Sequence, residues 1–177
     1  LFGSPHVLDN YIHSEQLDLV EITNEGLNSK MFIDLPDHVA TFLENNRSMF
    51  YSHSYGFNLS IYHDYDDFRR FFIVTAKATD DHGKEFIAAM EANQYPIYTV
   101  QYHPERIISE WKNQSATHPH EAVQAALLQA LFLISEAKKN NHIFQRDQYQ
   151  QIMLRSSHEE VFINASWPKV SFYSLKL

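Results

Sequence analysis

The chain has 177 residues, of which 44% are hydrophobic and 14% aromatic, so it is long and apolar enough for one domain with a sizeable core, which excludes a disordered chain. Its formal net charge of −8 gives no electrostatic basis for binding nucleic acid or an anionic membrane surface. The sequence contains no cysteine, which excludes a disulfide framework and a cysteine-ligated metal, and no apolar run approaches the roughly 20 residues that a membrane-spanning helix needs.

Short runs of apolar, β-branched and aromatic residues, each ended by turn residues, predict a series of strands. Their ranges are 17–23, 49–53, 71–76, 85–91 and 97–100. The turn Asp80-Asp81-His82-Gly83 joins the third and fourth of these runs into a hairpin, which an all-parallel sheet would lack. The second of these runs is followed by Ser54-Tyr55-Gly56.

Helical signals lie between these strands and after them. Pro36 or Asp37 is placed to open a short helix that contains residues 39–43, and residues 64–70 predict a helical turn. The strongest helix is predicted over 121–139, where apolar residues recur at helical spacing.

The helix predicted over 121–139 is apolar on more than one stripe, because Leu128, Phe132 and Leu133 extend its apolar surface. This predicts burial on more than one side, either under a sheet or at a subunit contact, so a homodimer is one arrangement to test. Beyond it, residues 152–177 alternate apolar runs with turn residues and predict terminal strands at the edge of the domain.

A cluster of acidic residues at 64–67 follows His63 and raises the question of a metal site. The charges alternate with Arg69 and Arg70, and their spacing fits no metal-ligand template. We therefore interpret the cluster as a solvated face and predict no metal site.

The strand over 97–100 leads directly to His103-Pro104-Glu105. Pro104 favours an extended conformation at His103, and Glu105 lies close enough in sequence to turn back towards the imidazole. A carboxylate held against one ring nitrogen selects the tautomer and makes the other nitrogen a competent general base. A lone His-x-Glu is common, however, so the spacing alone leaves a purely structural histidine open.

The longer segment Val100-Gln101-Tyr102-His103-Pro104-Glu105 resembles part of the active site of class I glutamine amidotransferase-like hydrolases. Its continuation through Glu110-Trp111-Lys112-Asn113 narrows the resemblance to the gamma-glutamyl hydrolase family. The resemblance covers about residues 18–177 and implies an α/β, flavodoxin-like sandwich, here without its N-terminal strands. It implies that residues 1–177 form the C-terminal portion of one such domain.

The resemblance also implies roles for individual residues. His103 and Glu105 are the expected catalytic base and its orienting carboxylate in a Cys-His-Glu triad. His53 and Tyr55 match the family's His followed closely by an aromatic residue and are expected to bind substrate, as is Tyr102. From the residues alone, a half-buried structural histidine at the end of a strand is the favoured interpretation of His53.

The nucleophile that the resemblance requires is absent, because the chain contains no cysteine. Residue 1 is Leu rather than Met, so we expect a processed or partial chain whose nucleophile lies in a missing N-terminal half, in the same or a separate polypeptide. These residues alone are predicted to be inactive. With that half, the implied function is thioester-mediated hydrolysis of gamma-glutamyl bonds in folate polyglutamates or related peptides, without a cofactor.

Two other functions stay open. The chain could be a non-catalytic structural or binding relic of the fold, or belong to a glutaminase-type amidotransferase that delivers ammonia to a partner.

Four Asn-x-Ser patterns, at Asn46, Asn58, Asn113 and Asn164, bear on localisation. Chance supplies on the order of one in a chain of this size, although polar loops produce such patterns easily. We interpret them as glycosylation sites, which predicts a secretory route to the lysosome, the vacuole or the extracellular space without membrane insertion.

Overall fold

The computed structural model of the chain describes residues 8–111, 117–143 and 145. Contacts divide the chain into two compact units, residues 1–137 and 138–177. The first unit contains every helix and strand described below, and the second is described only at 138–143 and 145. The strands predicted over 152–177, and Asn113 and Asn164, lie outside the described residues.

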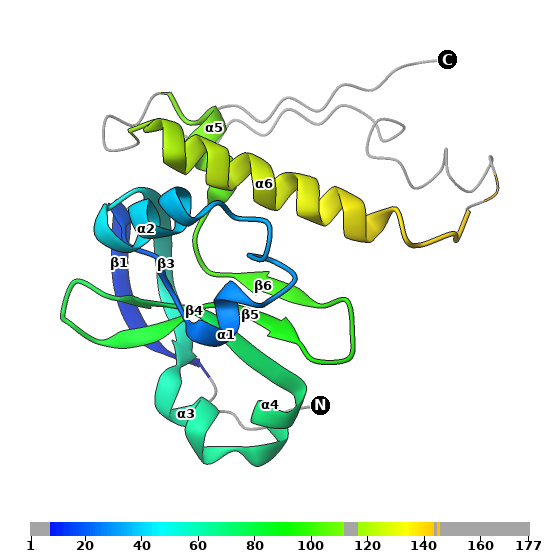
Figure 1. Ribbon diagram of the computed structural model, residues 1–177. Helices are drawn as coiled ribbons and strands as arrows, with labels where there is room; N and C mark the ends of the chain where they lie inside the picture. The colour runs from blue at the N-terminus through cyan, green and yellow to red at the C-terminus, as the bar shows by residue number, and fades with distance from the viewer. Residues whose placement is uncertain (1–7, 112–116, 144, 146–177) are drawn as a thin grey trace. The chain divides into compact units, whose positions relative to one another are not determined.

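The first unit combines six strands with six helices (Figure 1). The strands are β1 (Leu8–Asp18), β2 (Glu21–Ile22), β3 (Met49–Asn58), β4 (Phe72–Thr79), β5 (Glu85–Ala92) and β6 (Tyr98–Val100). The helices are α1 (Asn24–Leu27), α2 (Asp37–Asn45), α3 (Leu59–Asp64), α4 (Asp66–Phe71), α5 (Pro104–Ser109) and α6 (His120–Ala137). In the described part of the chain, no helix is long and apolar enough to cross a membrane.

The strands form one sheet in the order β1-β3-β5-β4-β2, and β6 pairs with β5 on the side that β3 also occupies. The pairs of described strands are antiparallel. The predicted hairpin is confirmed, because β4 and β5 pair from Thr79 and Glu85, next to the turn, to Phe72 and Ala92 at its far end. In the turn, Asp80 Oδ1 accepts hydrogen bonds from the backbone N–H groups of His82 and Lys84.

The side chains of β5 are divided between two cores. Successive residues of a strand point to opposite faces of a sheet, and a register shift in the pairing with β4, between Ile87 and Ala89, interrupts this alternation. Phe86 and Ala88 belong to the larger core, which also contains residues of α2, α5 and α6. Ile87 and Met90 belong to a smaller core with Phe68 of α4. Figure 1 shows α2, α5 and α6 on one side of the sheet and α3 and α4 on the other. The larger core therefore lies under the helices that surround His103.

Two sequence predictions differ from the observed strands. The strand predicted over 17–23 is divided, because β1 ends at Asp18, whose carboxylate accepts a hydrogen bond from Leu19 N–H, and β2 covers only Glu21–Ile22. The strand predicted over 49–53 is longer in the structure, because the segment 54–56 also belongs to β3. It stays extended because this part of β3 pairs with β1 and Gly56 lies closely against the ring of Tyr11.

The predicted helices are confirmed at α2 and α6, but the burial expected for α6 is not. The buried residues of α6 are Ala122, Ala125, Ala126 and Gln129. Leu127, Leu131, Leu133 and Ile134 are exposed. Within the described residues α6 is therefore buried along one side, and the subunit contact stays a prediction.

Candidate active site

His103 lies where β6 leads into α5, at the residue before the first turn of the helix. Pro104 occupies the first helical position, where its missing N–H costs no helical hydrogen bond. The backbone N–H of His103 donates to the carbonyl oxygen of Phe50 on β3 at 2.8 Å, and its own carbonyl accepts from Arg106 N–H at 3.2 Å. The backbone of His103 is therefore held by both the sheet and the helix.

Glu105 turns back towards the imidazole as predicted. Its Oε1 lies 2.9 Å from Nδ1 of His103. An ionised carboxylate only accepts hydrogen bonds, so Nδ1 is the donor and Nε2 is the nitrogen able to accept a proton. The side chains are 39% and 64% exposed, so this pair, hereafter the dyad, is accessible from solvent. This is the arrangement that a general base and its orienting carboxylate need.

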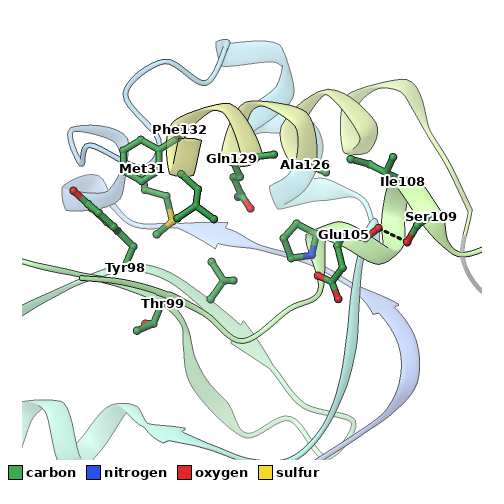
Figure 2. Close-up of a pocket in the computed structure, with 13 residues that line it drawn as sticks. Met31, Tyr98, Thr99, Glu105, Ile108, Ser109, Ala126, Gln129 and Phe132 are labelled. Atoms are coloured by element: carbon green, nitrogen blue, oxygen red, sulfur yellow. Dashed lines mark hydrogen bonds between the residues drawn. The ribbon is translucent and has the colours of Figure 1, made fainter. Parts of the chain in front are cut away.

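A cavity of about 500 Å³ lies beside the dyad, between β6, α5 and α6. Glu105 and Ser109 face it from α5, Tyr98 and Thr99 from β6, and Gln129 from α6 (Figure 2). Its other lining residues are all apolar: Met31, Val100, Pro104, Ile108, Ala126, Ala130, Phe132 and Leu133. The cavity therefore offers a large apolar surface next to the carboxylate of the dyad.

Two polar contacts, one buried and one partly buried, hold residues of the cavity wall, and the sequence did not indicate them. Glu91 of β5 is buried, and its two carboxylate oxygens accept the backbone N–H groups of Lys30 and Met31 at 3.2 Å each. The Tyr98 hydroxyl donates to Glu136 of α6 at 2.9 Å, and burial raises the pKa of Tyr98 to about 12. One sequence signal could have predicted part of this wall: Ala126, Gln129 and Leu133 are spaced so that they share one face of a helix.

His53 and Tyr55 lie on β3, two residues apart. The His53 ring packs against the rings of Tyr51 and Phe86, with centroid distances of 5.9 and 5.0 Å, whereas Tyr55 is 60% exposed. Tyr51 also contacts Tyr102 at 5.9 Å, which links His53 to the segment that carries the dyad. Neither His53 nor Tyr55 lines the cavity beside Glu105.

Tyr102 is buried, with 3% of its surface exposed. Its hydroxyl accepts a hydrogen bond from Gln129 Nε2 of α6 at 2.6 Å, and burial raises the pKa of Tyr102 well above its usual value. In this structure Tyr102 ties the residue before His103 to α6. Its predicted contact with substrate stays a prediction.

The remaining sequence predictions concern glycosylation and metal binding. Asn46 follows α2 and is exposed, with its Nδ2 donating to Phe42 O at 3.0 Å. Asn58 ends β3 and is partly buried, with Nδ2 donating to Asp9 at 3.2 Å. Asp66 pairs with Arg69 on α4, and within the described residues no three acidic, histidine or cysteine side chains are grouped to hold a metal ion.

Comparison with known proteins places this site in a family. The family model described as "Glutamine amidotransferase class-I" matches residues 18–118, which include both residues of the dyad. Gamma-glutamyl hydrolase of the rat is 34% identical over 130 residues, which is 72% of this chain and 40% of that protein. The mouse protein of the same name is 36% identical over 136 residues, 75% of this chain and 41% of its own length.

The human gamma-glutamyl hydrolase is 34% identical over 134 residues, which cover 75% of this chain and 42% of the human protein. The aligned part of the chain thus spans about two fifths of the length of these curated relatives. The chain therefore belongs to the class I glutamine amidotransferase family, in which it groups by sequence with the gamma-glutamyl hydrolases.

Proposed function

We propose that this chain supplies the base and its orienting carboxylate to a cysteine hydrolase that cleaves gamma-glutamyl bonds. The observation that carries the proposal is the 2.9 Å contact between Nδ1 of His103 and Oε1 of Glu105, in a segment that matches the family. The names of the rat, mouse and human relatives support the choice of bond. The nucleophile is a cysteine in a polypeptide segment outside these 177 residues, because the chain contains none.

In the proposed reaction, Nε2 of His103 takes the thiol proton and the thiolate attacks the carbonyl carbon of the gamma-glutamyl amide. The imidazolium, stabilised by Glu105, then passes this proton to the departing amine as the C–N bond breaks, which leaves a thioester. His103 next removes a proton from water, which attacks the thioester, and returns the proton to the departing thiolate. The products are the amine and the free gamma-carboxylic acid, with the cysteine regenerated.

For the substrate we propose folate polyglutamates or related gamma-glutamyl peptides. The exposure of Tyr55 supports its availability to a bound peptide, and the imidazole of His53 suits a directional hydrogen bond to a glutamyl carboxylate or amide. Substitution of Tyr55 by Ala is expected to raise KM for a gamma-glutamyl peptide more than it lowers kcat. An unchanged KM would remove Tyr55 from the proposed substrate site.

The test is hydrolysis of a gamma-linked glutamyl peptide by the protein in its complete native form, with whatever segments accompany these residues in the cell. His103→Ala is expected to lower kcat by on the order of 10³-fold or more, because the thiol then lacks its base. His82→Ala is the matched control, since His82 lies in the exposed turn between β4 and β5. Equal turnover by both variants would contradict the proposal.

A glutaminase function is the second candidate, because the matching family model is described as an amidotransferase. Free glutamine in the same assay, with ammonia as the measured product, separates the two reactions. The third possibility is a non-catalytic relic. Intact mass and peptide mapping of the native material that find no cysteine-bearing polypeptide would favour the relic over both enzymes.

We further infer passage through the secretory pathway to a lysosomal, vacuolar or extracellular location. The exposure of Asn46 supports it as an acceptor site. Glycopeptide mass spectrometry of native material tests this inference, and an unmodified peptide containing Asn46, together with unmodified Asn58, Asn113 and Asn164, would contradict it.

A further inference from the structure

Phe50 contacts His103 through both its backbone and its ring. Its carbonyl oxygen accepts the His103 N–H at 2.8 Å, and its ring meets the imidazole edge-on, with centroids 6.4 Å apart and planes at 62°. Phe50 itself is fully buried in the larger core. The side of the imidazole that faces the protein therefore rests on a rigid aromatic ring.

Arg106 covers the same ring from α5. Its guanidinium carbon lies 3.9 Å from the centroid of Phe50, and its Nη2 donates to Glu110 Oε2 at 3.3 Å. The Arg106 and Glu110 side chains are 24% and 21% exposed, so the ion pair is largely shielded from solvent. A planar guanidinium can stack on an aromatic face and donate to a carboxylate at the same time, which an ammonium group does less well.

These contacts close a ring of interactions through three residues. Phe50 binds the backbone of His103, the carbonyl of His103 accepts the N–H of Arg106, and the guanidinium of Arg106 returns to Phe50. The contact of His103 with Glu105, by contrast, lies between side chains that are 39% and 64% exposed. Exposed pairs of this kind hold their geometry weakly, since solvent screens them and both side chains lose entropy. The orientation of the imidazole therefore needs support from the buried side.

We propose that Phe50 and Arg106 are positioning residues that hold the imidazole of His103 with Nδ1 towards Glu105 and Nε2 towards the reacting thiol. Glu110 in turn holds Arg106 over the ring. The catalytic consequence rests on the proposed function, whereas the orientation of His103 does not. The proposal therefore has one readout that requires no turnover and a second that does.

The test uses the complete native form of the protein with ¹⁵N-labelled histidine, and compares Arg106→Met, Arg106→Lys and Glu110→Gln with the unaltered protein. In the unaltered protein, NMR is expected to show the tautomer with the proton on Nδ1 of His103, because the tautomer follows the hydrogen bond that the ring makes. Arg106→Met is expected to shift the population towards the Nε2–H tautomer. It is also expected to lower kcat by about 10- to 100-fold with KM nearly unchanged, since a misplaced base lowers the rate of the chemical step.

Arg106→Lys keeps the charge but not the planar stack, so its tautomer population and kcat are expected between those of the unaltered protein and Arg106→Met. Glu110→Gln leaves the core intact and is expected to shift both readouts in the same direction by a smaller factor. Arg47→Met is the matched control, because Arg47 is 70% exposed and its ion-pair partner is Asp18 rather than a residue of the dyad. It is expected to change neither readout.

Unchanged tautomer populations in both folded Arg106→Met and Glu110→Gln would overturn the proposal, as would a fall in kcat without any change of tautomer. If Arg106→Met does not fold, Glu110→Gln alone decides by the same criteria. A tautomer shift in a protein that hydrolyses no gamma-glutamyl bond would support the positioning role and refute the proposed reaction.

Discussion

At the scale of single residues, a buried hydrogen bond between Tyr102 and Gln129 lies next to His103 in sequence. The hydroxyl of Tyr102 accepts from Gln129 Nε2 at 2.6 Å, and both residues are buried between the segment before α5 and helix α6. A buried amide that loses its partner keeps the full desolvation penalty, whereas removal of both partners is close to neutral. The interaction energy of the Tyr102–Gln129 pair can therefore be measured by a double-mutant cycle.

Tyr102→Phe is expected to lower the free energy of unfolding by about 1–3 kcal/mol, because it leaves the buried amide of Gln129 without its acceptor. Adding Gln129→Leu is expected to recover most of this loss, since no buried amide is then left unpaired. Denaturant unfolding of the complete protein measures both effects. Tyr55→Phe is the control, since Tyr55 is exposed, with an expected change within about 0.5 kcal/mol. A double variant that is no more stable than Tyr102→Phe would refute this account.

The sequence was most informative where the two residues in contact are close together in the chain. Glu105 lies two residues from His103 at the start of a helix, so local geometry alone brings the carboxylate to the imidazole. The ring of Phe50 that contacts His103 lies far from it in sequence, and no pattern of residue types predicted this contact. Tyr102 illustrates the same limit. Tyr102 is buried in the core whereas the next residue, His103, is 39% exposed, and the sequence pattern does not show which of the two faces the core.

At the scale of elements, the short helix α1 is fitted closely against β4. Thr23 caps α1 by accepting the N–H of Gly26 at 2.9 Å, and its hydroxyl donates to Val74 O of β4 at 2.8 Å. A Cβ atom at Gly26 would lie 2.0 Å from the carbonyl oxygen of Thr75, which belongs to the backbone of β4. Glycine is required at this position by the close approach of two backbones.

Gly26→Ala is expected to destabilise the protein by about 1–3 kcal/mol or more, because relief of the overlap requires α1 to move away from β4. Gly83→Ala is the matched control. Gly83 has a φ of 80° in the β4–β5 turn, with no atom within 4 Å of an added Cβ. Its cost is expected to be limited to backbone strain of about 1 kcal/mol. Thermal unfolding of both variants checks the comparison, and the interpretation of Gly26 fails if the two losses are equal.

At the scale of the whole molecule, the core is rich in tyrosine whose hydroxyl groups are shielded from water. Burial raises the pKa of Tyr51 well above its usual value, and that of Tyr11 to about 12. In the unfolded chain a tyrosine ionises near pH 10. The folded state therefore keeps these protons at a pH where the unfolded state has lost them, and this difference links stability to alkaline pH.

The contribution of these tyrosines to stability is expected to be complete below about pH 10 and to be lost as the pH rises from there through about 12. Denaturant midpoints measured between pH 8 and 12 check this, with tyrosinate absorbance followed in parallel. Tyr11→Phe is expected to make the decline with pH shallower, because one of the raised pKa values is then removed. A constant midpoint from pH 9 to 12 would contradict the assignment.

Sequence patterns by themselves determined the features that depend on neighbouring residues: the hairpin of β4 and β5, helix α2, and the His103–Glu105 pair. The same is true of the family, because its motif is a continuous segment. Only the tertiary structure decided that β3 continues past residue 53, that α6 is buried along one side, that an apolar cavity adjoins Glu105, and that Phe50 supports His103. The physical reason is that periodicity reveals which residues are apolar but not which distant surface they meet, since that choice is made by packing across the whole sheet.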